Sequence, residues 1–239
     1  TTGMGGYIET LTDPSYAGQI ILQTFPLIGN YGIIPEDFEG QCRVSGYVVR
    51  EACEHPSNFR CQGTLDEFLK AQGVPGISGV DTRALTKHVR VYGTLRGRIV
   101  EGEATEADLE LAKSFEMHDQ VARCTCREAY EVAGEGKYHI AVMDFGLKRG
   151  ILRSLHDRGC TLTVFPADTP AETILASGCD GVMLTNGPGD PQDNPKAIAA
   201  IRELMGKKPV FGICLGHQLM ALAMGGRTVQ MKYGHHGAN

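Results

Sequence analysis

The sequence predicts an α+β domain followed by an α/β domain built on a parallel sheet. From residue 137 onward, short apolar runs alternate with stretches of helical spacing, whereas the first half mixes strand and helix patterns without a regular order. This alternation implies a parallel sheet, because parallel strands are joined by crossovers that are usually helices. A small, polar stretch at 133–137 separates the two patterns. The predicted domains are therefore residues 1–132 and 138–239.

The second half is predicted to contain four strands, each followed by a helix. The expected strands are the apolar runs at 138–143, 161–165, 181–185 and 209–213. The expected helices lie at 147–158, after Pro170, at 195–205 and at 215–224. In folds of this kind ligands bind beyond the carboxyl ends of the strands, so a functional site is expected in the loops at those ends.

The first half is predicted to be a mixture of short strands and helices. Thr64 and Glu67 have the spacing of a capping box, and Gly73 is suited to end the helix that they begin. The helices are expected at 64–73, 81–93 and, on the surface, 105–115. The strands are expected at 19–25, 43–50 and, more weakly, 99–100.

The composition is that of an ordinary soluble globular protein. The chain has 239 residues, of which 42% are hydrophobic and 21% charged, and its formal net charge is −5. A negative charge argues against nucleic-acid binding, and no apolar run approaches the roughly 20 residues of a membrane span. The first residues show no targeting signal and no initiator methionine. We therefore expect a cytoplasmic protein whose start is missing.

The eight cysteines are irregularly spaced, and a chain of this size does not need disulfides to fold. Cys124 and Cys126 form the only close pair, and as neighbours on a strand they would face the same side. They are either buried free thiols or part of a metal site. Free thiols are favoured, because no second pair has the spacing of a zinc site. No metal is expected, and the compartment is expected to be reducing.

Residues 212–218, Gly-Ile-Cys-Leu-Gly-His-Gln, are the strongest functional signal. They follow a predicted buried strand and begin a helix, as a nucleophile elbow does. Glycines on both sides of Cys214 fit a sharp strand-to-helix turn, where a Cβ would clash with the turn or with a substrate. The helix N-terminus favours thiolate over thiol. Cys214 is the predicted nucleophile, and the alternative is a buried cysteine in a tight turn.

Residues 185–191, Thr-Asn-Gly-Pro-Gly-Asp-Pro, directly follow the preceding predicted strand. Because the carboxyl ends of neighbouring parallel strands meet at one edge of a sheet, this loop should lie beside Cys214. Its backbone N–H groups, together with that of Leu215, would then face an oxyanion. The alternative is an ordinary turn before a helix, which this composition also permits.

Together the two motifs resemble a class I, triad-type glutamine amidotransferase domain, which has a flavodoxin-like α/β fold. Five further motifs narrow the resemblance to the small subunit of carbamoyl phosphate synthetase, and it covers essentially the whole chain. These motifs are residues 11–16, 28–32, 79–83, 144–149 and 232–239. The resemblance implies a subunit that hydrolyses glutamine and passes ammonia to a large synthetase subunit. That partner would use ATP, Mg and bicarbonate to make carbamoyl phosphate for arginine and pyrimidine synthesis.

The resemblance also implies roles for individual residues. Cys214 would attack the glutamine side-chain amide and form a thioester, and the amides of Gly187 and Leu215 would form the oxyanion hole. Ser15 would reach in from the other domain to bind glutamine, although its own context is that of a turn residue after Asp-Pro. The expected glutamine-binding residues are Ser15, Gly187, Gly189, Leu215 and Gln218.

The histidines do not complete the site. A cysteine nucleophile of this type needs a base and a group that orients the base. The family takes both from a later His-x-Glu segment, which this sequence lacks. His217, His235 and His236 are expected to be structural. We therefore expect the second domain to be incomplete at its C-terminal end.

The triplet Asp144-Phe145-Gly146 spells a kinase motif, but no glycine-rich loop or His-Arg-Asp loop accompanies it. A structural turn is expected there.

Two other functions remain open for the whole chain. A catalytically silent binding or regulatory module would keep the fold and the partner surface without the rest of the triad. The amidotransferase of another synthetase would explain residues 138–239 but not the first half.

Overall fold

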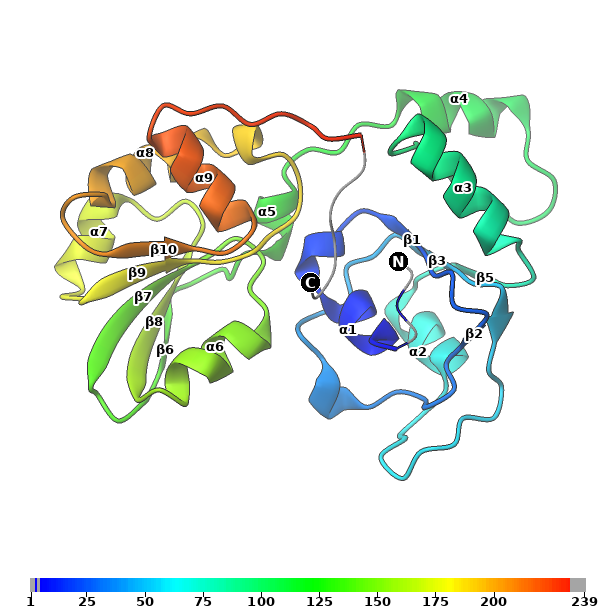
Figure 1. Cartoon of the computed structure of the whole chain (residues 1–239), viewed down its shortest axis with the longest axis horizontal. Coiled ribbons are helices and arrows are strands. Elements are labelled where there is room, and N and C mark those ends of the chain that lie inside the picture. The colour runs from blue at the N-terminus through cyan, green and yellow to red at the C-terminus, as the bar shows by residue number, and fades with distance from the viewer. Residues whose placement is uncertain (1–2, 4, 233–239) are drawn as a thin grey trace.

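The computed structural model describes residues 3 and 5–232, and its elements form two groups that lie side by side (Figure 1). The first group contains α1 (Tyr7–Thr12), η1 (Pro14–Tyr16), β1 (Ile20–Leu22), β2 (Leu27–Ile28), η2 (Pro35–Asp37), β3 (Gly46–Val48), β4 (Glu51–Ala52), α2 (Leu65–Gln72), β5 (Gly76–Ile77), α3 (Thr82–Tyr92) and α4 (Glu106–Ser114). The second contains α5 (Gln120–Cys124), β6 (Tyr130–Val132), β7 (Tyr138–Asp144), α6 (Arg149–His156), β8 (Cys160–Pro166), α7 (Ala171–Ala176), β9 (Gly181–Leu184), η3 (Pro191–Asp193), α8 (Pro195–Leu204), β10 (Val210–Gly212) and α9 (Leu215–Ala223).

The second group is a five-stranded sheet in the order β10-β9-β7-β8-β6, and every neighbouring pair is parallel except β6 with β8. Alternate residues of β7 point to opposite faces of the sheet. Val142 packs with residues of α6, whereas Ala141 and Met143 pack with residues of α7, α8 and α9. Figure 1 shows α6 on one side of the sheet and the other three helices on the opposite side. The predicted parallel α/β sheet is therefore confirmed.

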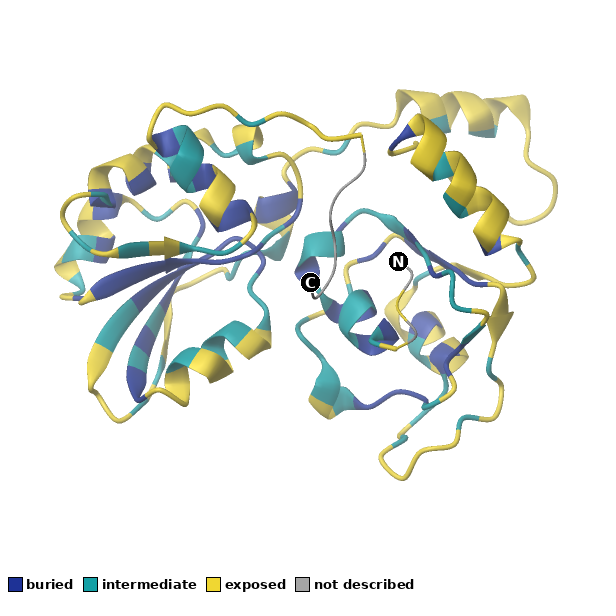
Figure 2. Ribbon diagram, in the orientation of Figure 1, coloured by how far each residue is buried: buried dark blue, intermediate teal, exposed yellow. Residues whose placement is uncertain are grey.

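The first group is a small α+β unit with its own core. Its strands form two parallel sheets, β1-β3-β5 and β2-β4. Tyr7, Leu11, Ile28, Tyr47 and Leu65 are among the buried residues of this core. The capping box predicted at the start of α2 is present, and Gly73 ends the helix in the left-handed conformation. The helix predicted at 105–115 is α4, which has no buried residue and, like α3, is largely exposed (Figure 2).

Several details of the sequence prediction were wrong. Residues 99–100 are not a strand, and the side chain of Ile99 instead lies over the backbone of Gly46. Cys124 ends a helix and Cys126 lies in the loop after it, so they are not strand neighbours. The strands at 19–25 and 43–50 shorten to three residues each, and α1 was not predicted. In addition, β6 lies before the stretch 133–137 but pairs with β8, so the large sheet includes residues on both sides of that stretch.

The sheet order fixes where a ligand site can form. The chain leaves β7 to form β8 on one side and then crosses to form β9 and β10 on the other. The loops after β7 and β9 therefore diverge at the carboxyl edge of the sheet. In open α/β sheets ligands bind in the crevice at such a switch point.

Candidate active site

Cys214 occupies a strained turn between β10 and α9. Its backbone angles are φ 52° and ψ −110°, and within the described ranges Asp119 is the only other non-glycine residue with positive φ. Such a conformation costs on the order of 1–3 kcal/mol and persists only where the surroundings enforce it. The side chain is exposed at the carboxyl edge of the sheet. This is the geometry of a nucleophile elbow.

The glycines beside Cys214 are required by close backbone contacts. A Cβ on Gly212 would lie 2.6 Å from the carbonyl carbon of Gly216 and from the nitrogen of His217. A Cβ on Gly216 would lie 2.4 Å from the carbonyl oxygen of Leu184. These contacts are with backbone, which cannot rotate away. The predicted reason for the glycines, the absence of room for a Cβ, therefore matches the structure.

The loop after β9 lies against the elbow. The amide of Gly216 donates a hydrogen bond to the carbonyl of Thr185 at 3.0 Å. A Cβ on Gly187 would lie 2.3 Å from the carbonyl oxygen of Phe145 and 2.8 Å from Cδ2 of Leu215, so this loop lies close to the backbone of the turn after β7 and to the Leu215 side chain of the elbow. Within residues 5–232, no acceptor is found for the amides of Gly187 and Leu215. Both N–H groups are free to bind an anion.

The turn after β7 is held by its own polar side chains. Asp144 is buried and accepts hydrogen bonds from the amides of Gly146 at 2.9 Å, Leu147 at 2.8 Å and Cys126 at 2.8 Å. The hydroxyl of Thr185 accepts a bond from the amide of Phe145 at 2.9 Å, which ties the β7 loop to the β9 loop. The kinase-like triplet is thus a structural turn, as predicted.

Ser15 is brought from the first group to the β9 loop. The side-chain amide of Asn186 donates a hydrogen bond to Oγ of Ser15 at 2.9 Å. Burial raises the pKa of the neighbouring Tyr16 phenol, and electrostatic interaction with Asp13 and Cys214 also raises it. The segment that contains Ser15 and Tyr16 therefore lies close to both the β9 loop and the predicted nucleophile.

The remaining predicted residues are less constrained. Gly189 has φ +85° and faces Gln120, with an ideal Cβ 3.3 Å from Cβ of that side chain. Gln218 is exposed, and its amide donates to the carbonyl of Cys214 at 3.1 Å. His217 was expected to be structural, but it is exposed, and its side chain has no hydrogen-bonding partner among the residues that the structure describes. His235 and His236 lie outside the described residues, as does all of the motif at 232–239 except its first residue.

Comparison with known proteins identifies the family. Residues 1–99 match the family "Carbamoyl-phosphate synthase small chain, CPSase domain", and residues 141–239 match "Glutamine amidotransferase class-I". The carbamoyl phosphate synthase small chain of Clostridium perfringens is 50% identical over 240 residues, which are 100% of this chain and 68% of that protein. The chain belongs to the carbamoyl phosphate synthase small-chain family.

Two other small chains show slightly higher identity. Those of Bacillus caldolyticus and Listeria monocytogenes serotype 4b are 53% and 54% identical over 241 residues, and this chain spans 66% of the length of each. Among solved structures, a putative GMP synthase protein from Thermoplasma acidophilum is 25% identical over 37% of this chain and 45% of its own, with a TM-score of 0.33. The agreement with the small-chain family thus extends over both halves of the chain.

Three residues that had no role in the sequence prediction connect the two groups of elements. They are Asn186, Asp13 and Lys148. Asn186 is 3% exposed. The ammonium of Lys148 lies 3.2 Å from a carboxylate oxygen of Asp13. All three residues lie in the motifs that carried the resemblance, but nothing in their spacing showed that they would meet.

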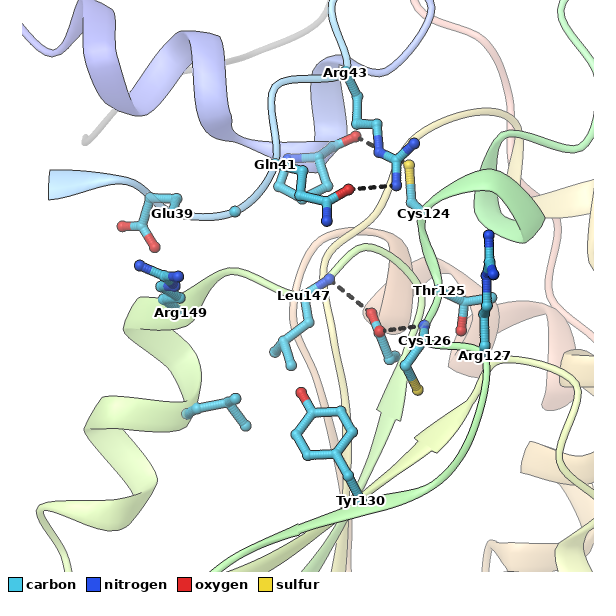
Figure 3. A pocket seen from close by; sticks show the side chains of 14 residues that line it. Glu39, Gln41, Arg43, Cys124, Thr125, Cys126, Arg127, Tyr130, Leu147 and Arg149 are labelled. Atoms are coloured by element: carbon cyan, nitrogen blue, oxygen red, sulfur yellow. Dashed lines mark hydrogen bonds between the residues drawn. The ribbon is translucent and has the colours of Figure 1, made fainter. Parts of the chain in front are cut away.

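A cavity of about 520 Å³ lies between the two groups, and Figure 3 shows the side chains that line it. The guanidinium groups of Arg43, Arg127 and Arg149 line it, together with the thiols of Cys124 and Cys126. Cys214 is not among its lining residues. The cavity therefore does not hold the predicted nucleophile.

Residues 3 and 5–232 contain no group of three or more His, Cys, Asp or Glu side chains placed to hold a metal ion. Over the same residues, no helix has both the length and the apolar character that a membrane span needs.

Proposed function

We propose that this chain carries the glutamine-hydrolysing centre of a carbamoyl phosphate synthase, with Cys214 as its nucleophile. The observation that supports this most directly is the backbone of Cys214, which is held at φ 52° in an exposed turn at the carboxyl edge of a parallel sheet. Strain of this kind is found at sites where a side chain must be presented to a substrate. Family membership supplies the substrate, which is glutamine.

The proposed reaction starts when the Cys214 thiolate attacks the carbon of the glutamine side-chain amide. Negative charge then develops on the amide oxygen, where the free N–H groups of Gly187 and Leu215 would stabilise it. The nitrogen leaves as ammonia once it is protonated, and a thioester remains on the sulfur. Water then cleaves the thioester to release glutamate. Ser15, Gly189 and Gln218 are proposed to hold the substrate.

The ammonia would pass to a large synthetase subunit, because free ammonia protonates and escapes in water. We propose that this partner binds ATP with Mg and uses bicarbonate to form carbamoyl phosphate for arginine and pyrimidine synthesis. No phosphate-binding loop of the Gly-x-x-x-x-Gly-Lys type occurs in this chain.

All eight cysteines are free thiols, which fits the proposed cytoplasmic location. The division expected from the sequence, residues 1–132 and 138–239, leaves α5 and β6 in the first part, although β6 pairs with β8 of the large sheet.

The test is the substitution Cys214→Ala in the complete small chain, assembled with its large subunit. Glutamine-dependent synthesis should fall to background, whereas synthesis from added ammonium should stay within about twofold, because only the source of ammonia is removed. Cys179→Ala, which removes a buried thiol between α7 and β9, is the matched control and should leave both rates unchanged. Glutamine-dependent synthesis that survives Cys214→Ala would show that Cys214 is not the nucleophile. Absence of glutamine-dependent synthesis from the parent complex would favour the alternative, a silent binding module.

A further inference from the structure

The cavity between the two groups has walls from both of them. Its lining residues include Glu39 and Arg43 of the first group, and Cys124, Arg127 and Tyr130 of the second. Its volume of about 520 Å³ falls within the roughly 300–1,000 Å³ that is typical of small-molecule sites. The proposed hydrolysis of glutamine uses none of these side chains. The cavity is therefore a second place in the chain with the size of a ligand site.

Three arginines line this cavity, although the chain as a whole has a formal net charge of −5. The guanidinium of Arg43 is bonded to a neutral group, Oε1 of Gln41, at 2.7 Å. Neither Arg43 nor the other two, Arg127 and Arg149, forms an ion pair within residues 5–232. Because a guanidinium stays protonated and presents its donors in a planar fork, these groups favour an anion.

The acidic and sulfur groups of the wall compete little with such an anion. Asp144 is buried and accepts hydrogen bonds from three backbone amides, and Oε2 of Glu39 accepts one from Gly150 at 2.9 Å. Both carboxylates are therefore already engaged. Burial raises the pKa of Cys124 and of Cys126 to about 11, so both thiols are uncharged at neutral pH.

The cavity has a cationic end and an apolar end. Figure 3 shows Arg43 and Arg127 at the end near Cys124, and Leu147 and Tyr130 at the other. Burial raises the pKa of Cys124, and the charge of Arg43 opposes this shift, as expected of a guanidinium close to that thiol. The ring of Tyr130 is 41% exposed, which leaves part of its surface free to pack against a ligand.

We propose that this cavity binds a phosphate monoester whose phosphate group lies between Arg43 and Arg127. The ester group lies against Leu147 and Tyr130. Guanidinium forks match phosphate oxygens, and a dianion compensates two cationic groups where a single carboxylate would compensate one. Since Arg43 belongs to the first group and Arg127 to the second, the ligand joins the two groups and stabilises their contact. The site is distinct from the proposed glutamine site and does not depend on it.

The test is the binding of phenyl phosphate to the 239-residue chain, measured by isothermal titration calorimetry, with inorganic phosphate and phenol as the two halves of the probe. Phenyl phosphate should bind at least tenfold more tightly than either half. Arg43→Gln and Arg127→Gln should each raise its Kd about tenfold, because each removes hydrogen bonds to a charged group. Arg90→Gln, on the exposed helix α3, is the matched control and should change the Kd less than twofold.

The proposal is overturned if the parent chain does not bind phenyl phosphate, or if Arg90→Gln costs as much as Arg43→Gln. Binding of inorganic phosphate as tight as that of phenyl phosphate overturns it too, because the apolar end would then contribute nothing. Tyr130→Ala examines that end directly. It should weaken binding of phenyl phosphate about fivefold and of inorganic phosphate less than twofold, whereas equal losses contradict the assignment.

Labelling with phenylglyoxal tests the bridge between the two groups without any substitution. This reagent modifies exposed guanidinium groups, and peptide mass spectrometry follows each arginine separately. Saturating phenyl phosphate should slow the modification of Arg43 and of Arg127 about tenfold and leave that of Arg90 unchanged. All three arginines are exposed in the free chain, so each reports on the ligand. Protection of Arg43 or Arg127 alone would show that the ligand does not join the two groups, and would overturn the proposal.

Discussion

At the scale of single residues, the cysteines show how strongly position controls reactivity. Cys214 is exposed at a helix N-terminus, whereas Cys124 and Cys126 line an interdomain cavity and are half-buried. Burial raises the pKa of each of these two thiols to about 11. The carboxylate of Asp144 contributes to the raised pKa of both thiols, while Arg43 acts in the opposite direction on the pKa of Cys124. Only the thiolate form of a cysteine reacts with an alkylating agent.

Alkylation by iodoacetamide should therefore discriminate between the cysteines as a function of pH. At pH 8 only about a thousandth of Cys124 and Cys126 is thiolate, so these two should react far more slowly than exposed Cys214. Their rates should rise about tenfold per pH unit until the pH approaches their pKa of about 11. Peptide mass spectrometry after timed labelling measures this, with the chain confirmed as folded at each pH. Labelling of Cys126 at pH 8 as fast as that of Cys214 would contradict the prediction.

At the scale of the elements, the elbow depends on how closely β10, α9 and β9 approach. The amide of Ile213 donates to the carbonyl of Leu184 at 3.0 Å and that of Gly216 to Thr185 at 3.0 Å, so the turn continues the ladder of the sheet. The absence of a Cβ at Gly216 lets α9 start directly over the end of β9. The position of Cys214 is thus set by backbone packing and not by contacts of its own side chain.

Gly216→Ala should destabilise the fold and displace the elbow. The new Cβ would lie 2.4 Å from the carbonyl oxygen of Leu184, and relief of such a backbone clash costs about 1–3 kcal/mol. Gly97→Ala is the matched control, since its Cβ would meet only Cδ1 of Ile20 at 3.9 Å, and it should change the free energy of unfolding by less than about 1 kcal/mol. Urea unfolding of the two variants and the parent gives both values. Equal stability of the two variants would show that the elbow tolerates a side chain.

At the scale of the whole molecule, the proposed site belongs to both groups of elements. Bonds between the groups run from Asn186 to Ser15, from Lys148 to Asp13, and from the amide of Gly150 to the carboxylate of Glu39 at 2.9 Å. The first two converge on the turn before β1, beside the proposed oxyanion amides. Separation of the groups would therefore remove Ser15 from the site even if the elbow stayed intact.

The 239-residue chain should react once at Cys214 but turn over glutamine very slowly. Turnover needs a base to activate water and an acid to protonate the leaving ammonia, and within residues 5–232 no histidine or carboxylate is hydrogen-bonded to the Cys214 sulfur. His217 is exposed on the first turn of α9. The measurement is glutamate release by the folded chain, with and without the large subunit, against stoichiometric labelling of Cys214. Sustained release would direct attention to His217, His235 and His236 as bases.

The sequence by itself determined the elements that carry strong local signals. The capping box at Thr64, the glycine that ends α2, and the strand–helix alternation after residue 137 were all predicted, because each depends on neighbouring residues or on hydrophobic periodicity. The same holds for the elbow, since two glycines around a cysteine between a strand and a helix constrain the backbone directly. Ile99 and the Cys124–Cys126 pair were predicted wrongly, because their conformation depends on contacts with distant segments.

Only the tertiary structure decided which residues meet at the site. Ser15 and Asn186 are separated by 171 positions, and no periodicity or local motif encodes a hydrogen bond across that distance. The pairing of β6 with β8 and the ion pair between Asp13 and Lys148 are likewise set by how the two groups pack. Local patterns restrict the backbone of a few residues at a time. The hydrogen-bond partners of Ser15, by contrast, include Asn186 from a distant loop. The sharp turn that carries Cys214 could thus be predicted from the sequence, but the hydrogen bonds that join Ser15, Asn186 and Lys148 around it could not.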